Sequence, residues 1–95
     1  MAHIKKKKKV DYEALGSAFM RIPGMDVLAA RALLDLGFSE TYQLSGRSPE
    51  VLFEAHKIKK PDAPIHILWA FRMLVYAAEN TEELDPKKLK LSSWA

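Results

Sequence analysis

The sequence predicts an all-α fold. Apolar residues recur at helical spacing in several segments, and no segment alternates apolar and polar residues with the period of two that a half-buried strand requires. Proline and glycine separate these segments at short intervals. The chain has 95 residues, of which 48% are hydrophobic and 28% charged, so it suits one small soluble domain with a single core.

The basic charge of the chain is concentrated at one end, in the five consecutive residues Lys5, Lys6, Lys7, Lys8 and Lys9. Because like charges in such a run repel each other, we expect residues 1–10 to be a disordered tail and residues 11–95 to form the folded domain. The chain has 15 basic and 12 acidic residues, so without the five lysines 10 basic residues remain against 12 acidic ones, a balance of −2. The tail either attracts nucleic acid or only keeps the chain soluble.

The first half of the domain is predicted to contain two helices. We expect the first over residues 12–21, with Asp11 as its N-cap and Gly16 as a weak point of about 1 kcal/mol relative to alanine. The Pro23-Gly24 pair then breaks the helical pattern, because proline disfavours helical angles in the residue before it and glycine permits positive φ. The second helix is expected over residues 27–36.

The middle of the chain is predicted to contain a short helix and a longer one. Ser39 is the expected cap of the short helix over residues 40–45. The longer helix is expected over 49–57, because Ser48-Pro49-Glu50 combines an N-cap, a proline at the first helical position and an acid in the first turn. Residues 58–63 then form a basic, proline-broken connection.

The most apolar part of the chain is predicted to be a central helix that begins at Pro64 and ends near Glu79. Its apolar stretch of fourteen residues, Ile65–Ala78, spans ~21 Å as a helix, which is shorter than a bilayer core. We therefore expect a buried helix and no membrane span. Asp85-Pro86 is expected to start a last turn, after which three apolar residues fold back onto the body: Leu89, Leu91 and Trp94.

The segment between the first two helices, Ile22-Pro23-Gly24-Met25-Asp26, resembles the helix-hairpin-helix motif. The motif has the pattern hydrophobic-x-Gly-hydrophobic-Gly, and it aims the free N–H groups of the second helix at a phosphate oxygen. Contacts of this kind recognise the nucleic-acid backbone and not the bases. The candidate binding residues in this turn are Gly24, Met25, Asp26 and Val27.

Asp26 stands where the motif has its second glycine. An aspartate there is a good N-cap, whose carboxylate would accept from the N–H of Leu28 or Ala29. It would occupy donors that a phosphate needs, and its charge would repel the anion. The turn is therefore either a phosphate site or a purely structural turn.

A second segment with the same pattern, Leu44-Ser45-Gly46-Arg47-Ser48, follows 22 residues later. It is either a degenerate second hairpin or a chance recurrence of the residues that cap helices. In this turn the sequence offers two further candidate phosphate-binding residues, Gly46 and Arg47. A basic group beside His56 adds three more candidates: Lys57, Lys59 and Lys60.

Beyond the hairpin, about 80 of the 95 residues resemble the small bacterial helix-hairpin-helix proteins called the pathogenicity-locus family. The resemblance implies a compact five-helix helix-hairpin-helix domain, similar to the sterile-alpha-motif fold, with a link to DNA. It does not imply a reaction. The similar segments are Ile22-Pro23-Gly24, Leu36-Gly37-Phe38, Leu44, Ser48-Pro49-Glu50-Val51-Leu52, Leu68-Trp69-Ala70-Phe71-Arg72, Val75-Tyr76-Ala77-Ala78 and Trp94.

The sequence contains no recognised catalytic or cofactor-binding motif. There is no cysteine, which suits a reducing cytoplasm, and the three histidines have no recognised metal spacing. No glycine-rich phosphate loop or serine-histidine-acid set is present, so we expect no enzyme, cofactor, metal or small-molecule substrate. Arg72 in the apolar helix is interpreted as a structural ion pair or a carbonyl cap.

Two functions remain. The first is a cytoplasmic module that binds duplex DNA, or nucleic acid generally, without sequence specificity through the turns, the basic residues and the tail. The second is a protein–protein interaction domain on the same scaffold, in which the hairpin is only structural. The −2 balance of the body favours the second function, and the hairpin and tail favour the first.

Overall fold

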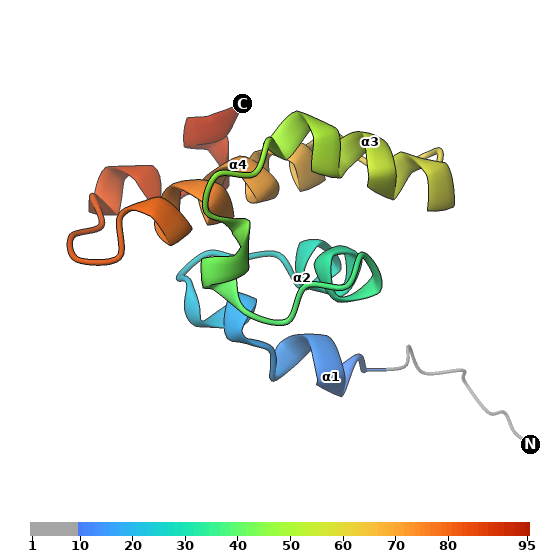
Figure 1. Cartoon of the computed structure of the whole chain (residues 1–95), viewed down its shortest axis with the longest axis horizontal. Helices are drawn as coiled ribbons and strands as arrows, with labels where there is room; N and C mark the ends of the chain where they lie inside the picture. The colour runs from blue at the N-terminus through green and yellow to red at the C-terminus, as the bar shows by residue number, and fades with distance from the viewer. Residues whose placement is uncertain (1–9) are drawn as a thin grey trace, which may run out of the picture.

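A computed structural model describes residues 10–95, so the five lysines of the predicted tail lie outside the described residues. Within residues 10–95 the chain contains four α-helices, four short 3-10 turns and no strand, which confirms the all-α prediction (Figure 1). The elements are α1 (Tyr12–Leu15), η1 (Ala18–Arg21), α2 (Val27–Asp35), η2 (Thr41–Leu44), α3 (Pro49–Lys59), α4 (His66–Glu79), η3 (Pro86–Lys88) and η4 (Leu91–Trp94).

The prediction of one helix over residues 12–21 is wrong, because the chain leaves the helix after α1. The Gly16 N–H donates to the Tyr12 carbonyl at 3.0 Å, and the Ser17 hydroxyl donates to the Ala14 carbonyl at 2.7 Å. Ser17 itself is extended, with φ −73° and ψ 161°. A glycine and a serine that bonds to the backbone therefore end the first helix, and η1 follows as a separate turn.

The segment predicted as a helix over residues 40–45 is only the 3-10 turn η2, and Ser39 is not its cap. The Gln43 side chain folds back instead, and its Oε1 accepts from the N–H of Ser39 at 2.8 Å and from that of Glu40 at 2.9 Å. The domain therefore has four α-helices in its described part, one of them a single turn, and not five longer ones.

The starts of α2 and α3 match the prediction, because their caps are local. Asp26 Oδ1 accepts from the Leu28 N–H at 2.7 Å, and Ser48 Oγ accepts from the Val51 N–H at 3.3 Å. α3 continues to Lys59, two residues beyond the predicted end. Basic residues in its last turn interact favourably with the C-terminal end of the helix dipole.

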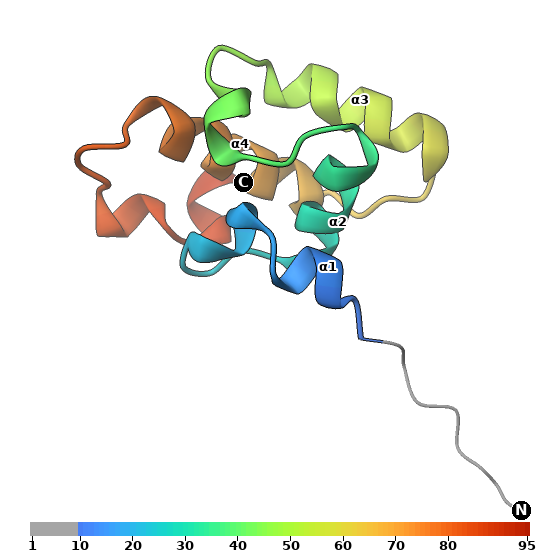
Figure 2. The same ribbon diagram turned by 60° about the horizontal axis from the view of Figure 1, so that its bottom comes forward.

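The apolar helix α4 forms the centre of the domain, as predicted, although it begins two residues after Pro64. α3, η2, α2 and η4 all pack against it (Figure 2). Phe71, Met73 and Leu74 are fully buried in α4, and Phe19 of η1 and Leu33 of α2 complete the same core. No helix within residues 10–95 is both long enough and apolar enough to cross a membrane.

The C-terminal segment folds back onto α4, which confirms that prediction. Leu89, Leu91 and Trp94 are partly buried against the core. The Trp94 indole N–H donates to the Lys88 carbonyl at 2.7 Å, and its ring lies 5.4 Å from that of Tyr76. The Trp94 carbonyl accepts from the Arg72 guanidinium at 2.6 Å.

Candidate nucleic-acid interface

The two glycine turns that precede α2 and α3 have the same geometry. Gly24 and Gly46 both have a φ of +79°, and each turn closes with a hydrogen bond three residues apart. The Met25 N–H donates to the Ile22 carbonyl at 3.2 Å, and the Arg47 N–H donates to the Leu44 carbonyl at 3.0 Å. Positive φ at the third position is the signature of a type II turn, so the repeat in the sequence corresponds to a repeated turn in the structure.

The two turns lie against opposite ends of α4. The Asp26 carboxylate, at the end of the first turn, contacts His66, which is the first residue of α4. The Gly46 N–H, in the second turn, contacts Glu79, which is the last residue of α4. The helix rise places these two ends ~20 Å apart, so the turns cannot bind the same phosphate.

The first turn retains backbone donors. Within residues 10–95, the N–H groups of Gly24, Asp26 and Val27 have no hydrogen-bond partner. Met25 differs, because its N–H is used within the turn and its side chain is buried in the core. The candidate residues of this turn therefore divide into three with amides available to a ligand and one with a packing role.

The carboxylate of Asp26 makes two bonds, only one of which could be predicted from its neighbours. Oδ1 caps α2 through Leu28, as expected, and Oδ2 lies 2.7 Å from His66 Nε2. The side chains of Asp26 and His66 are 22% and 33% exposed, so solvent screens this pair only in part. His66 therefore fixes the carboxylate beside the amides of the first turn.

Basic residues that the sequence analysis did not single out lie on the two chain segments next to the first turn, η1 and the C-terminal segment. A Cβ at Gly24 would lie 3.1 Å from the Leu89 carbonyl, so the C-terminal segment runs directly beside this turn (Figure 2). Within the described part of the chain, none of the basic residues on these two segments forms an ion pair: Arg21, Lys87, Lys88 and Lys90. The approach of the C-terminal segment to this turn depends on the folding back of the C-terminus, which the order of residues alone does not reveal.

The second turn has less capacity for an anion. Glu79 Oε2 accepts from the Gly46 N–H at 2.7 Å, so a carboxylate of the chain occupies that donor. The exposed Arg47 guanidinium lies 5.3 Å from the centre of the Phe38 ring. A phosphate at this turn would have to displace Glu79.

The remaining candidate lysines lie at the other end of α3, away from Arg47. Lys57 pairs with Glu54 at 3.0 Å, and Lys59 Nζ donates to the Asp35 carbonyl at 3.0 Å. Lys60 follows as the exposed C-cap residue of the helix. Since α3 has 11 residues and spans ~16 Å, the structure separates Arg47 from the lysines with which it was grouped in the sequence.

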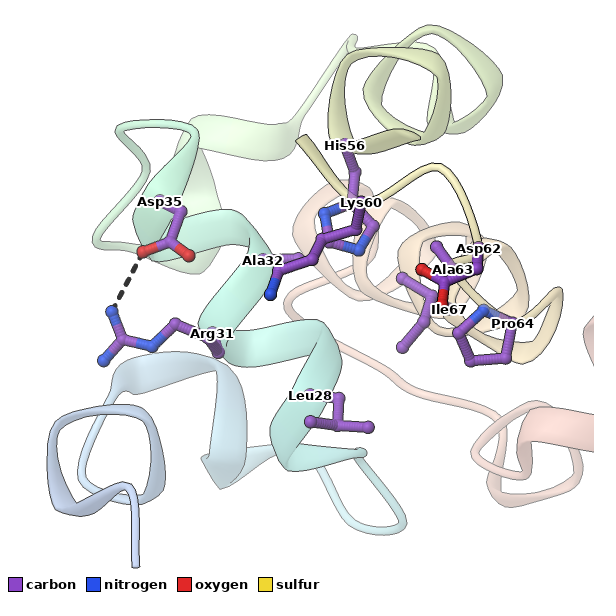
Figure 3. Close-up of a pocket in the computed structure, with 10 residues that line it drawn as sticks. All are labelled: Leu28, Arg31, Ala32, Asp35, His56, Lys60, Asp62, Ala63, Pro64 and Ile67. Carbon is purple, nitrogen blue, oxygen red and sulfur yellow. Dashed lines mark hydrogen bonds and ion pairs between the residues drawn. The ribbon is translucent and has the colours of Figure 1, made fainter. Parts of the chain in front are cut away.

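A small apolar pocket lies between α2 and the connection from α3 to α4 (Figure 3). Its volume of about 260 Å³ is below the usual range of ~300–1,000 Å³ for small-molecule sites. Burial and the nearby Lys60 charge lower the pKa of His56, one of its lining residues. The pocket is lined by Leu28, Arg31, Ala32, Asp35, His56, Lys60, Asp62, Ala63, Pro64 and Ile67.

The other arginines of the body have structural roles. Arg31 bonds to Asp11 at 2.7 Å, to Glu13 at 2.7 Å and to Asp35 at 3.0 Å, which holds α1 against α2. The hydrogen bond from Arg31, followed by that from the Ala14 N–H, lowers the pKa of Asp11 to about 2. The stabilising effect of this depressed pKa is complete above the ordinary value of 3.8 and is lost as the pH falls toward 2.

The Arg72 guanidinium donates to the Trp94 carbonyl and forms an ion pair with Glu50 at 3.2 Å. The sequence analysis expected either an ion pair or a carbonyl cap for this arginine, and the structure has both. The pKa of Glu50 is lowered, first by its own backbone N–H and then by Arg72. These contacts tie α3 and the C-terminus to α4.

The chain matches no protein family, no curated protein and no solved structure among those with which it was compared. Within residues 10–95, no group of three or more histidine, aspartate and glutamate side chains is arranged to hold a metal ion.

Proposed function

We propose that this chain is a non-enzymatic module of the helix-hairpin-helix type that binds the backbone of duplex DNA without sequence specificity. The observation that carries the proposal is the first turn itself, where the amides of Gly24, Asp26 and Val27 have no partner among residues 10–95 and the segment that carries Lys87, Lys88 and Lys90 runs alongside. Amides at a helix start and nearby cations are the groups that bind phosphate oxygens. The Lys5–Lys9 tail adds charge that attracts a polyanion over a longer range.

The proposal predicts that charges near the first turn contribute more to binding than charges at the far end of α3. Replacing both Arg21 and Lys90 by glutamine should weaken binding of a fluorescent duplex and reduce the slope of log K against log salt by ~2. The measurement is fluorescence anisotropy over a range of salt concentrations. Replacing Lys57 and Lys60 by glutamine removes the same charge and is the matched control.

The control pair is expected to change the salt slope by less than half as much as the pair at the first turn. Equal effects would show that binding depends only on total charge and would contradict an interface centred on the first turn. Duplexes of unrelated sequence should bind with the same affinity, because phosphate contacts carry no base information.

Asp26 opposes phosphate at the first turn, so its charge should limit affinity. Asp26→Asn keeps an oxygen that can cap α2 and a polar partner for His66, but it removes the negative charge. We expect this variant to bind a duplex several-fold more tightly at low salt, with a melting temperature close to that of the parent chain. Asp26→Ala loses the cap as well and should destabilise the domain by ~0.5–2 kcal/mol. Unchanged affinity in Asp26→Asn would mean that no phosphate contacts this turn.

A protein–protein interaction domain is the second candidate, and a specific observation favours it. Carboxylates of the chain itself lie at both turns, Asp26 at the first and Glu79 at the second. If the five-lysine tail and the first-turn charges can be neutralised without changing duplex binding, the turns are structural and this second function becomes the better proposal.

A further inference from the structure

Helix α3 carries apolar residues on two opposite faces. Leu52 and Phe53 are buried against the core, whereas Val51 is 65% exposed and Ile58 is 83% exposed. Residues seven apart on a helix lie within about 20° of each other, so Val51 and Ile58 share one face. Ala55 lies between them on the same face, about 40° from Val51. We call these three residues, Val51, Ala55 and Ile58, the outer stripe.

Val51 and Ile58 of the outer stripe are exposed and Ala55 is half-buried, and α3 runs along one edge of the domain in both views (Figures 1 and 2). Valine and isoleucine are weaker helix formers than alanine, so their presence at exposed helix positions does not serve the stability of α3 itself. Single exposed apolar residues are ordinary, but a stripe opposite the core face gives the helix a second apolar side.

The charges beside the outer stripe are distributed unevenly along the helix. Glu50, Glu54 and Lys57 lie on the same flank of the stripe, at about 60–120° from Val51. The bond of 3.0 Å between Lys57 Nζ and Glu54 Oε2 agrees with this placement. Glu50 also bonds to Arg72 of α4, so the charges that this flank offers to a second copy are Glu54 and, nearer the end of the helix, Lys57.

This order of charges complements itself when two α3 helices run antiparallel. With a two-fold axis between residues 54 and 55, Val51 lies opposite Ile58 of the second copy. The same axis places Lys57 of the second copy level with residue 52, between Glu50 and Glu54 of the first. Because this axis keeps equivalent flanks on the same side of the pair, the lysine and the acids face each other. In a parallel pair the two-fold axis would place equivalent flanks on opposite sides, so Lys57 of one copy would not face Glu54 of the other.

We propose that the outer stripe is a dimer interface, across which two copies of this chain pack α3 against α3 in antiparallel orientation. Ala55 lies next to the two-fold axis, where a small side chain allows the two helices to approach closely. One helix of ~16 Å buries less area than a standard interface, so the dimer forms weakly and exchanges rapidly. This proposal does not depend on nucleic-acid binding.

The test is sedimentation analysis of the full chain from about 10 μM to about 1 mM. The parent chain should shift from monomer to dimer over this range. Ile58→Glu places a charge in the stripe and should weaken association at least about tenfold. Because Ile58 is 83% exposed, far-ultraviolet circular dichroism should show an unchanged fold.

The matched control is Tyr42→Ser, which removes an exposed apolar side chain, 69% exposed, outside the outer stripe. It should dimerise like the parent chain. A parent chain that stays monomeric at about 1 mM overturns the proposal, as does a dimer that Ile58→Glu leaves intact.

The antiparallel orientation is tested by charge exchange. Lys57→Glu makes the flank wholly acidic and should weaken the dimer, most clearly at low salt. Adding Glu54→Lys to this variant restores opposite charges across the axis and should recover association. If Lys57→Glu dimerises as well as the parent chain, the proposed orientation is wrong.

Discussion

Leu74→Ala should lower the free energy of unfolding by ~2–5 kcal/mol, a large effect for the removal of one side chain. Leu74 is fully buried, and α4 is the helix against which α2, α3, η2 and η4 all pack. The truncation removes apolar contacts and leaves a cavity that the surrounding elements can fill only in part. A domain of this size is stabilised by only ~5–15 kcal/mol in total, so a substantial fraction of its stability would be lost.

Urea denaturation followed by circular dichroism measures this effect, with Ile58→Ala as the matched control. Ile58 is 83% exposed on α3, so its truncation should change the free energy of unfolding by less than ~0.5 kcal/mol. A loss below ~1 kcal/mol for Leu74→Ala would contradict the central position of α4. Leu68, at 8% exposure, should give a smaller loss than Leu74.

Local capping signals predicted the starts of α2 and α3, whereas the predictions of a helix over 12–21 and of a helix over 40–45 capped by Ser39 were wrong, and both errors have local causes. Ser48-Pro49-Glu50 starts α3 where expected, because the cap, the proline and the acid act within one turn. The first helix was predicted too long, since helix propensity gives Gly16 only a modest penalty. Helix propensity also takes no account of the Ser17 hydroxyl. This hydroxyl donates to the Ala14 carbonyl, and the chain leaves the helix at this point.

The candidate site could be predicted only where its contacts are short in sequence. The bond from the Leu28 N–H to Asp26 spans two residues and was expected. The bonds of Asp26 to His66 and of Gly46 to Glu79 span 40 and 33 residues, so they depend on how the turns pack against the ends of α4. The approach of Leu89, which precedes Lys90, to the first turn likewise depends on the folding back of the C-terminus.

These long-range contacts change what the hairpin motif implies. The sequence left open whether the second turn is a degenerate hairpin that binds phosphate or a chance recurrence, and the packing of α4 supplies a carboxylate, Glu79, to that turn. The first turn keeps amides without a partner among residues 10–95 and lies beside the C-terminal segment, so the proposed interface has one centre and not two. The tail then becomes the largest single source of positive charge in the chain.

Replacing all five residues of Lys5–Lys9 by glutamine should cause the largest loss of duplex binding of any change proposed for this chain. Without them the charge balance of the chain is −2, so the remaining body would repel a polyanion at long range. If the five lysines neutralise about five phosphates, they contribute ~4–5 to the slope of log K against log salt. That slope corresponds to a roughly 500-fold fall in affinity between about 50 mM and about 200 mM salt.

Anisotropy measurements of a labelled duplex with the parent chain and the five-glutamine variant determine both slopes. The variant should bind with a slope of ~1–2, which reflects the charges around the first turn alone. Its unfolding curve should match that of the parent chain, because the core of the described residues begins at Ala14. Equal affinity and equal slopes in the two proteins would mean that the lysines do not contact DNA. The binding would then have to come from the first turn, where the Arg21 and Lys90 substitutions test it independently.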